Sequence, residues 1–387
     1  MAARSKKATP KVMVVSHEAS RTGAPKVAVH LLRALRRNEV ETVVIHRWGG
    51  PMKRELDRAA LNGRLEPLST IRVALRRRQR TKRLARRVES FAINRVITRE
   101  RPDVIWCNTV LTATYARVAR SRGIPCVIYS HEARDLAQPA LERAHLLEPS
   151  IPLDGIVLVG CSTASAAILD ELIPTPASPA RVLHSPVDVD AVRREAGIKQ
   201  TNATLTNDRV RHRRTGEYGS TVVAVGKGNR RKGVGVFAKA AALTTSSNIR
   251  WVWVGEVSPA QRSTHVDYVG EVPTAAPEIA KADVFVLPSI SDQFPLVVLE
   301  AMALAKPVIA TRLPGTVEQL GDTGVYVEPH DHQGLADAVT NLIGDTQRAS
   351  ALGDAAAARC DELWGIEAFD EKVMGILELA MGSQDHG

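Results

Sequence analysis

Two carboxylates, Asp292 and Glu300, stand in the part of this sequence best suited to chemistry. The apolar run Val284–Leu287 before them has the length and β-branched bias of a buried parallel strand. Asp292 follows in a loop, and Glu300 lies near the start of a predicted helix, Leu296–Ala305. Parallel sheets bind ligands at the carboxyl ends of their strands, where a helix start offers unpaired N–H groups to phosphate. Because carboxylates accept hydrogen bonds from neutral hydroxyls, the combination indicates a phosphorylated sugar compound.

A cationic, glycine-rich turn follows another predicted strand, Thr221–Val225. The turn, Gly226–Gly233, contains four Lys or Arg residues and three glycines. Glycine lets the backbone approach a ligand closely, and the cations can neutralise a diphosphate. Runs of like charge are common on protein surfaces. The turn therefore indicates phosphate binding mainly because the acidic segment is also present. We expect the cations of this turn, Lys227, Arg230, Arg231 and Lys232, to be candidates for binding phosphate.

The acidic segment, residues 283–319, resembles the signature of retaining GT-B glycosyltransferases of family 4. Its matching residues are Pro288-Ser289, Asp292, Glu300-Ala301-Met302 and Pro307-Val308-Ile309. Asp292 stands where Glu is usual in the family, and Pro295 stands where Gly is common. The cationic turn resembles the family's Gly-Arg, four residues, Lys-Gly, with Lys227 in place of the Arg. The departures at Asp292 and Pro295 concern the contacts with the donor sugar.

The resemblance implies two Rossmann-like domains and a transferase that uses a nucleotide sugar with retention of configuration. It implies front-face attack, with the leaving phosphate assisting as base, and neither a metal nor another cofactor. The residues expected nearest the chemistry are His131, Asp292 and Lys232. The residues expected to bind the donor are Gly23, Gly226, Lys227, Arg231, Lys232, Gln293, Phe294, Pro295, Leu296 and Glu300.

Two of these residues come from the first half of the chain. Gly23 lies in the first strand–helix turn, where a parallel sheet exposes backbone amides. His131 ends an apolar strand, as the family's His does, and the resemblance implies that it holds a hydroxyl of the donor sugar. By contrast, Ser185-Pro186 replaces a family Asn-Gly, so no contact is carried over there.

The alternation of predicted strands and helices indicates an α/β protein with two doubly wound parallel sheets. We expect an acceptor-side domain at 1–199, a polar linker at 200–220, a donor-binding domain at 221–365, and a final segment, 366–387, whose helix packs back on the first domain. Predicted strands outside the acidic segment are Lys11–Ser16, Glu41–His46, Val104–Cys107, Cys126–His131, Gly155–Cys161, Thr221–Val225, Trp251–Val254, His265–Tyr268 and Gly324–Val327. Predicted helices include Lys26–Arg37, with Pro25 in first position, Gly334–Ile343 and Ile366–Met381.

Composition limits the class of protein. The chain has 387 residues, 44% of them hydrophobic and 24% charged, which is ordinary for a globular protein. We find no apolar run near the ~20 residues of a membrane helix, and the basic start lacks the apolar core of a secretory signal. Four cysteines without metal or redox spacing are expected to be buried thiols. These features predict a cytoplasmic protein, with peripheral attachment to the inner membrane face as an option.

The segment Arg72–Arg87 is strongly basic, with nine Lys or Arg among its sixteen residues. A thin apolar stripe predicts a helix with one narrow buried face. Such a helix suits an anionic membrane surface or an acidic acceptor, or is a solvated face. Nucleic acid is not expected despite the net charge of +10, because aromatic residues are only 4% of the chain and none interleaves with these cations.

Three functions remain open from the sequence: a sugar transferase acting on a glycan, lipid-linked or small-molecule acceptor, another sugar-nucleotide enzyme such as an epimerase or hydrolase, and a basic binding protein with a vestigial nucleotide site. The transferase is favoured, since a vestigial site needs neither the two carboxylates nor the cationic turn. The single Asp-x-Asp, Asp188–Asp190, falls between the predicted domains, where the resemblance implies no metal. Neither the base and sugar of the donor nor the acceptor can be read from the sequence.

Overall fold

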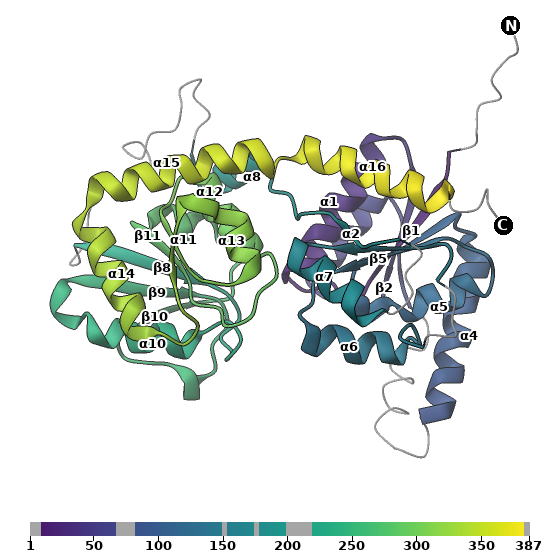
Figure 1. Cartoon of the computed structure of the whole chain (residues 1–387), viewed down its shortest axis with the longest axis horizontal. Coiled ribbons are helices and arrows are strands. Elements are labelled where there is room, and N and C mark those ends of the chain that lie inside the picture. The colour runs from purple at the N-terminus through teal and green to yellow at the C-terminus, as the bar shows by residue number, and fades with distance from the viewer. Residues whose placement is uncertain (1–8, 67–81, 149–152, 174–177, 199–218, 383–387) are drawn as a thin grey trace, which may run out of the picture. The chain divides into compact units, whose positions relative to one another are not determined.

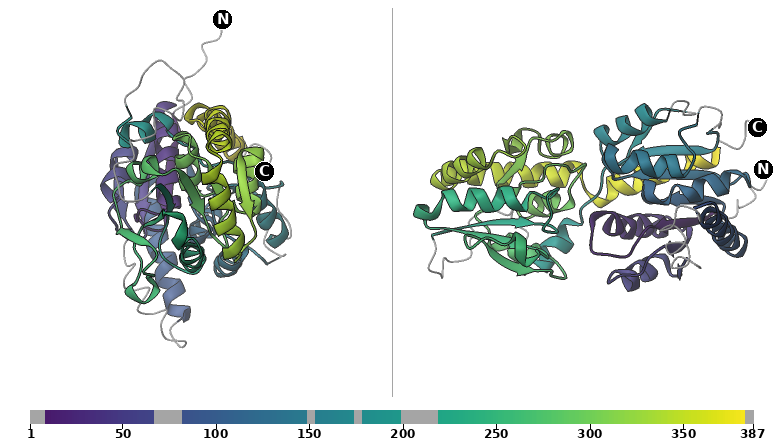
Figure 2. Two further views of the ribbon diagram at one scale, coloured as in Figure 1. Left: turned by 90° about the vertical axis from the view of Figure 1, so that its left-hand side faces the viewer. Right: turned by 90° about the horizontal axis from the view of Figure 1, so that it is seen from below.

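The computed structural model describes residues 9–66, 82–148, 153–173, 178–198 and 219–382. Contacts divide the chain into two compact units. Unit 1 comprises Met1–His184 and Phe369–Gly387, and unit 2 comprises Ser185–Ala368. Each unit is built on one parallel sheet with helices packed against it (Figures 1 and 2). The predicted linker lies outside the described residues, apart from its last two positions.

The sheet of unit 1 has seven parallel strands in the order β3-β2-β1-β4-β5-β6-β7. The central strands are uninterrupted apolar runs buried on both faces, as a sheet covered by helices requires. The strands are β1 Lys11–Ser16, β2 Glu41–His46, β3 Gly63–Leu65, β4 Val104–Cys107, β5 Cys126–Ser130, β6 Ile156–Gly160 and β7 Arg181–Val182. The helices are α1 Gly23–Arg37, α2 Lys53–Ala60, α4 Lys82–Glu100, η2 Val110–Thr112, α5 Thr114–Arg120, α6 Arg134–Arg143 and α7 Thr163–Leu172.

The sheet of unit 2 has six parallel strands in the order β10-β9-β8-β11-β12-β13. The strands are β8 Ser220–Val225, β9 Ile249–Val254, β10 Asp267–Gly270, β11 Val284–Leu287, β12 Val308–Thr311 and β13 Gly324–Val327. The α-helices are α8 Val189–Glu195, α10 Val234–Leu243, α11 Ala276–Lys281, α12 Leu296–Ala303, α13 Pro314–Leu320, α14 His332–Gly344 and α15 Thr346–Leu363, and the 3-10 turns are η3 Thr245–Ser247, η4 Pro259–Gln261 and η5 Gly321–Thr323.

An aromatic cluster in the core of unit 2 supports the start of the cationic turn. The Phe237 ring meets Trp251 and Trp253 edge-on, with centroids 4.9 and 5.5 Å away. Such arrangements are favoured by the quadrupoles of the rings. The indole N–H of Trp253 donates to the Gly226 carbonyl at 2.9 Å, which satisfies the polar end of a buried side chain. The first residue of the turn is thereby fixed to the core.

The last helix, α16 Ile366–Gly382, crosses from one unit to the other, because its residues from Phe369 onward group with unit 1. Phe369, Val373 and Leu377 are buried on it. The Arg37 guanidinium, in the last turn of α1, donates to both carboxylate oxygens of Asp370 at 2.5 and 2.7 Å. This bidentate pair fixes α16 to α1 within unit 1.

Two local predictions were wrong. The pair Pro314-Gly315 is typical of a turn and predicts one after the second strand of the acidic segment, but it begins α13, since proline needs no N–H partner at a first helical position. Helix α1 begins at Gly23, so Pro25 is its third residue, still within the first turn, where N–H groups have no intrahelical acceptor. The strands β3 and β7 were missed because they are only three and two residues long and carry little apolar pattern.

Candidate functional site

The structure joins the two sequence motifs of unit 2 through an ion pair. Lys232, from the cationic turn, places Nζ 2.5 Å from Oδ2 of Asp292, in the loop after β11. The side chains are only 17% and 11% exposed. The Ser289 hydroxyl donates to the same carboxylate oxygen at 3.3 Å. A partly buried pair with a third partner holds both charges in one geometry.

Main-chain contacts hold the turn and the loop together. The Ile290 N–H donates to the Arg231 carbonyl at 2.8 Å, and the Arg231 guanidinium donates to the Ser291 carbonyl at 3.1 Å. Gly233 has a left-handed backbone with φ of 77°, and a Cβ there would lie 1.8 Å from the Pro288 carbonyl oxygen. Only glycine therefore permits this approach of the turn to the loop.

The turn is richer in positive charge than its partner loop is in negative charge. Lys227, Arg230 and Arg231 are exposed, whereas Asp292 is the single acid in residues 288–295. The turn ends at the start of α10, where unpaired N–H groups add partial positive charge. The arrangement can neutralise an anion with several charges, such as a diphosphate. Asp292, already paired with Lys232, retains oxygens that can accept from hydroxyls.

Four predicted donor-binding residues, Gln293, Phe294, Pro295 and Leu296, lead into α12. The Phe294 ring is buried and meets Trp364 edge-on at 5.2 Å, so this side chain anchors the loop to unit 2. The Gln319 amide N–H donates to the Pro295 carbonyl at 3.1 Å. Pro295 caps the helix and Leu296 is its first residue, so the first amides of α12 lie where the loop ends.

Close packing behind the same loop requires a second glycine. A Cβ on Gly315, in the first turn of α13, would lie 1.7 Å from the Gln293 carbonyl oxygen. Glu300 is the fifth residue of α12, in the second turn of the helix, and its side chain is partly exposed. The loop is thus fixed by α13 on one side and by the cationic turn on the other.

The remaining predicted site residues, Gly23 and His131, belong to unit 1. Gly23 is the exposed first residue of α1, and His131 directly follows β5. Burial lowers the pKa of His131 to about 3, so its ring is neutral near pH 7. The ring hydrogen-bonds the Asn108 main chain, while Nε2 is buried and has no hydrogen-bond partner in the described structure. The free Nε2 is an acceptor for a ligand hydroxyl.

Sequence reasoning pointed to Glu132 only as a neighbour of His131 and missed Glu18, which lies at the same edge of the sheet. Glu18, in the loop after β1, accepts from the Ser20 hydroxyl at 2.5 Å and lies 3.3 Å from His17 Nε2. Glu132 is buried and accepts from the main-chain N–H of His131 at 2.9 Å. The only sequence signal was that these residues directly follow apolar strands.

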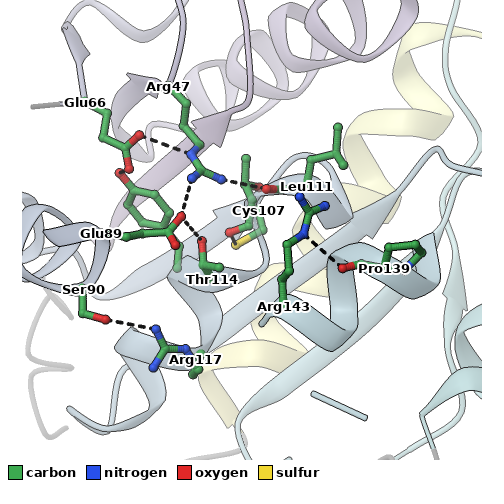
Figure 3. A network of polar contacts seen from close by, with 12 residues as sticks. Arg47, Glu66, Glu89, Ser90, Cys107, Leu111, Thr114, Arg117, Pro139 and Arg143 are labelled. Atoms are coloured by element: carbon green, nitrogen blue, oxygen red, sulfur yellow. Dashed lines mark hydrogen bonds and ion pairs between the residues drawn. The ribbon is translucent and has the colours of Figure 1, made fainter. Parts of the chain in front are cut away.

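A buried ion network supports the η2 segment (Figure 3). The Arg47 guanidinium donates to Glu66 at 3.2 Å, to Glu89 at 2.5 Å and to the Leu111 carbonyl at 2.7 Å. The Tyr115 hydroxyl donates to the second oxygen of Glu66 at 3.3 Å. This network fixes η2, the segment that follows Asn108 in the chain.

The Asp-x-Asp serves a helix cap. The Asp188 carboxylate accepts from the Ala191 N–H at 2.8 Å, which caps α8. Across the described ranges, no group of three or more His, Cys, Asp or Glu side chains is placed to hold a metal ion. All four cysteines are buried.

Most of the basic segment Arg72–Arg87 lies outside the described residues. Its end, from Lys82, forms the first residues of α4, where Arg86 and Arg87 are exposed. In the portion of the chain that the structure describes, no helix has both the length and the apolar character needed to cross a bilayer.

Comparisons with known families match both halves of the chain. Residues 21–191 match the family described as Glycosyltransferase Family 4, and residues 219–345 match Glycosyl transferases group 1. The D-inositol 3-phosphate glycosyltransferase of Acidothermus cellulolyticus is 31% identical over 310 residues, 71% of this chain and 66% of that protein. That of Paenarthrobacter aurescens is 31% identical over 183 residues, 40% of this chain. The match spans 45% of the latter protein's own length.

Solved structures share the fold at low sequence identity. The Anabaena HepE protein in complex with UDP-glucose has a TM-score of 0.74 and 16% identity, covering 96% of this chain and 100% of that one. Sucrose-phosphate synthase from Thermosynechococcus elongatus has a TM-score of 0.71 and 18% identity, covering 97% and 100%. The two parallel-sheet units are therefore those of the GT-B fold, as predicted. With both halves matched, this chain belongs to the family 4 type of glycosyltransferases.

Proposed function

We propose that this chain transfers a sugar from a nucleoside diphosphate donor to an acceptor hydroxyl, with retention of configuration and without a metal ion. The observation that carries the proposal is the joined turn and loop of unit 2. There Lys232 is paired with Asp292 beside three exposed cations, at the carboxyl ends of β8 and β11. Parallel sheets bind ligands at this edge, and this one combines phosphate-binding and hydroxyl-binding groups.

The reaction forms a bond between the acceptor oxygen and the anomeric carbon. The bond from that carbon to the phosphate oxygen breaks, the electron pair stays on the diphosphate, and the hydroxyl proton moves to the same leaving phosphate. Negative charge therefore grows on the diphosphate in the transition state. Cations and helix amides aimed there stabilise it more than the ground state. Lys232, Lys227, Arg231 and the first amides of α12 have this role in our proposal.

The carboxylates and His131 bind hydroxyls in the same scheme. Glu300 accepts hydrogen bonds from the two ribose hydroxyls, and Asp292 accepts from the transferred sugar while holding Lys232. His131 Nε2 accepts from a further hydroxyl of that sugar, because its neutral ring has one nitrogen without a partner in the described structure. Gly23 contributes its main-chain amide.

The names of similar proteins support this proposal. Two similar proteins are named inositol-phosphate glycosyltransferases, and the Anabaena structure contains UDP-glucose. A sugar-nucleotide epimerase or hydrolase would use the same donor site, so the acceptor distinguishes the three reactions.

The test begins with a panel of nucleotide sugars, scored by the rise in melting temperature of the full chain, since a ligand that binds only the folded state stabilises it. The stabilising donor is then incubated with and without acceptor extracts, and the products are identified by NMR. We expect acceptor-dependent transfer with unchanged anomeric configuration and undiminished activity in EDTA. Epimerised donor, or hydrolysis that ignores the acceptor, would support the alternative enzyme. No stabilisation by any nucleotide sugar would reject the donor site.

A further inference from the structure

The sheet of unit 1 has its own ligand-binding edge. Its strand order reverses between β1 and β4, and ligands of doubly wound sheets bind beside such a reversal, at the carboxyl ends of the strands. The loops there carry His17 and Glu18 after β1, Asn108 after β4 and His131 after β5. Because the strands are parallel neighbours, these residues gather at one edge although up to 114 positions separate them (131 − 17).

Three buried atoms at this edge have no hydrogen-bond partner in the described structure: His17 Nδ1, Asn108 Oδ1 and His131 Nε2. The Asn108 amide nitrogen donates to the Ala24 carbonyl at 2.8 Å. This bond identifies Oδ1 as the amide atom that has no partner in the described structure. In His131 the other ring nitrogen bonds the Asn108 main chain. In a neutral His17 ring, Nε2–H faces Glu18, which leaves Nδ1 as an acceptor. All three atoms can therefore accept hydrogen bonds from a ligand's hydroxyls or from water.

Glu18 adds a fixed negative charge beside these acceptors. Its Oε1 accepts from Ser20 at 2.5 Å and from Thr22 at 3.3 Å, and lies 3.3 Å from His17 Nε2. The hydrogen bond with His17, aided by Ser20 and Thr22, lowers the pKa of Glu18 to about 2, so the group is ionised at neutral pH.

The position of Glu18 matters as much as its charge. Thr22 is the N-cap residue of α1, a helix of 15 residues, so the carboxylate lies at the positive end of the helix dipole. A helix start of this kind is otherwise suited to a phosphate. Here the chain supplies its own anion, and a phosphate group of a ligand would meet a carboxylate at the same place.

With the acceptor expected on unit 1, we propose that it presents an uncharged polyol to this edge, without a phosphate or carboxylate on the bound part. The inference rests on the proposed transferase function and adds the class of its second substrate. His17, Glu18 and Asn108 accept hydrogen bonds from the acceptor's hydroxyls. This class of acceptor differs from the phosphorylated acceptor in the name of the D-inositol 3-phosphate glycosyltransferases that the chain resembles.

Matched pairs of acceptors test the proposal: inositol with inositol 3-phosphate, and glucose with glucose 6-phosphate. For each pair, kcat/KM for transfer and the shift in melting temperature are measured on the full chain with the stabilising nucleotide sugar present. We expect the neutral member to be favoured at least about tenfold, the size of a like-charge penalty at a partly solvated site. In Glu18→Gln the preference should fall below about threefold.

The control is Glu41→Gln, which makes the same charge change in an exposed residue at the start of β2, on the opposite edge of the sheet. It should keep the wild-type preference. Equal or better use of the phosphate ester by the wild-type chain would overturn the proposal. The proposal would also be overturned if neutral polyols at about 100 mM, a concentration that saturates even a weak site, produced neither transfer nor a shift in melting temperature. Donor-induced stabilisation, recorded in the same samples, separates either result from failure of the proposed function.

Discussion

At the scale of single residues, charge pairing explains the site better than the count of charges does. Asp292 is a methylene shorter than the Glu usual in the family, yet it reaches Lys232 at 2.5 Å because Gly233 lets the turn approach the loop. Neither residue is fully buried, so both remain accessible to a ligand. The pair places a cation for phosphate and a carboxylate for hydroxyls side by side.

Glu300 carries the first residue-scale prediction. Replacement by Gln keeps the shape of the side chain and removes the charge that strengthens hydrogen bonds from the two ribose hydroxyls. We expect a loss on the order of 2–4 kcal/mol in donor binding or transition-state stabilisation. Calorimetric titration with the donor measures it, and Asp337→Asn in α14 serves as the control. Unchanged donor affinity and turnover in Glu300→Gln would remove Glu300 from the site.

Lys306, between α12 and β12, carries a prediction about pH. It is 4% exposed, and burial lowers its pKa from 10.5 to about 8. The unfolded chain therefore binds more protons between about pH 8 and 10.5, so this group makes the folded state more stable as the pH rises through that window. At pH 7 it is charged in both states, and its burial costs stability.

The corresponding variant is Lys306→Met, which keeps the volume and removes the charge. We expect unfolding of unit 2 at pH 7 to require roughly 1–3 kcal/mol more free energy, with the gain shrinking towards pH 10.5. Denaturant titrations from pH 7 to 10.5 measure it. A variant that is less stable than the wild type at pH 7 would contradict the claim that the buried charge costs stability. It would instead indicate a stabilising interaction of Lys306 with the Asp283 carboxylate, whose charge raises the pKa of Lys306.

At the scale of elements, the strand–loop–helix from β11 to α12 could be predicted almost to the residue. Its apolar runs are bounded by Pro288 and Pro307, and its helix is rich in Leu, Ala and Met. The approach of this element to the cationic turn could not be predicted. It depends on β8 and β11 being neighbours in the sheet and on Gly233 fitting against Pro288, which no local pattern encodes.

Gly233 and Gly235 form a matched pair that tests this approach. Gly233→Ala would force a Cβ against the Pro288 carbonyl at a left-handed backbone, which should cost about 1–3 kcal/mol and separate Lys232 from Asp292. Gly235 lies within α10, where a Cβ meets no described heavy atom within 4 Å, so Gly235→Ala should stabilise by roughly 0.5–1 kcal/mol. Denaturant midpoints and donor affinity are compared. Equal effects of the two substitutions would show that the close approach is unimportant.

At the scale of the whole molecule, the sequence predicted two parallel-sheet units correctly, because strands and helices alternate throughout both halves. It did not predict the polar cluster of unit 1. Glu18, Asn108 and Glu132 come from three separate loops, and only the strand order β1-β4-β5 brings them to one edge. Local sequence patterns predict strands and helices but do not predict the order of distant strands in a sheet.

The charge of the whole chain carries a further prediction about surfaces. Each Arg near an anionic membrane contributes up to ~1 kcal/mol, screened over about 8–10 Å at physiological salt. Reversal of Arg76, Arg77, Arg80 and Arg83 to Glu should therefore abolish co-sedimentation with anionic vesicles, with donor affinity retained. The vesicle assay is run at low and high salt. Unimpaired transfer and vesicle binding by the reversed variant would leave the segment as a solvated face.

The central claim is that the turn and loop of unit 2 bind the diphosphate of a sugar donor, and the most direct test is the turnover of Lys232→Ala beside Lys239→Ala. Lys239 is an exposed cation on α10, so its loss changes the net charge equally. We predict that Lys232→Ala lowers kcat/KM for the donor about a hundredfold, the size of a lost charged hydrogen bond of ~2–3 kcal/mol, while its melting temperature changes little. Lys239→Ala should match the wild type. Wild-type turnover of Lys232→Ala at both limiting and saturating donor would contradict the account.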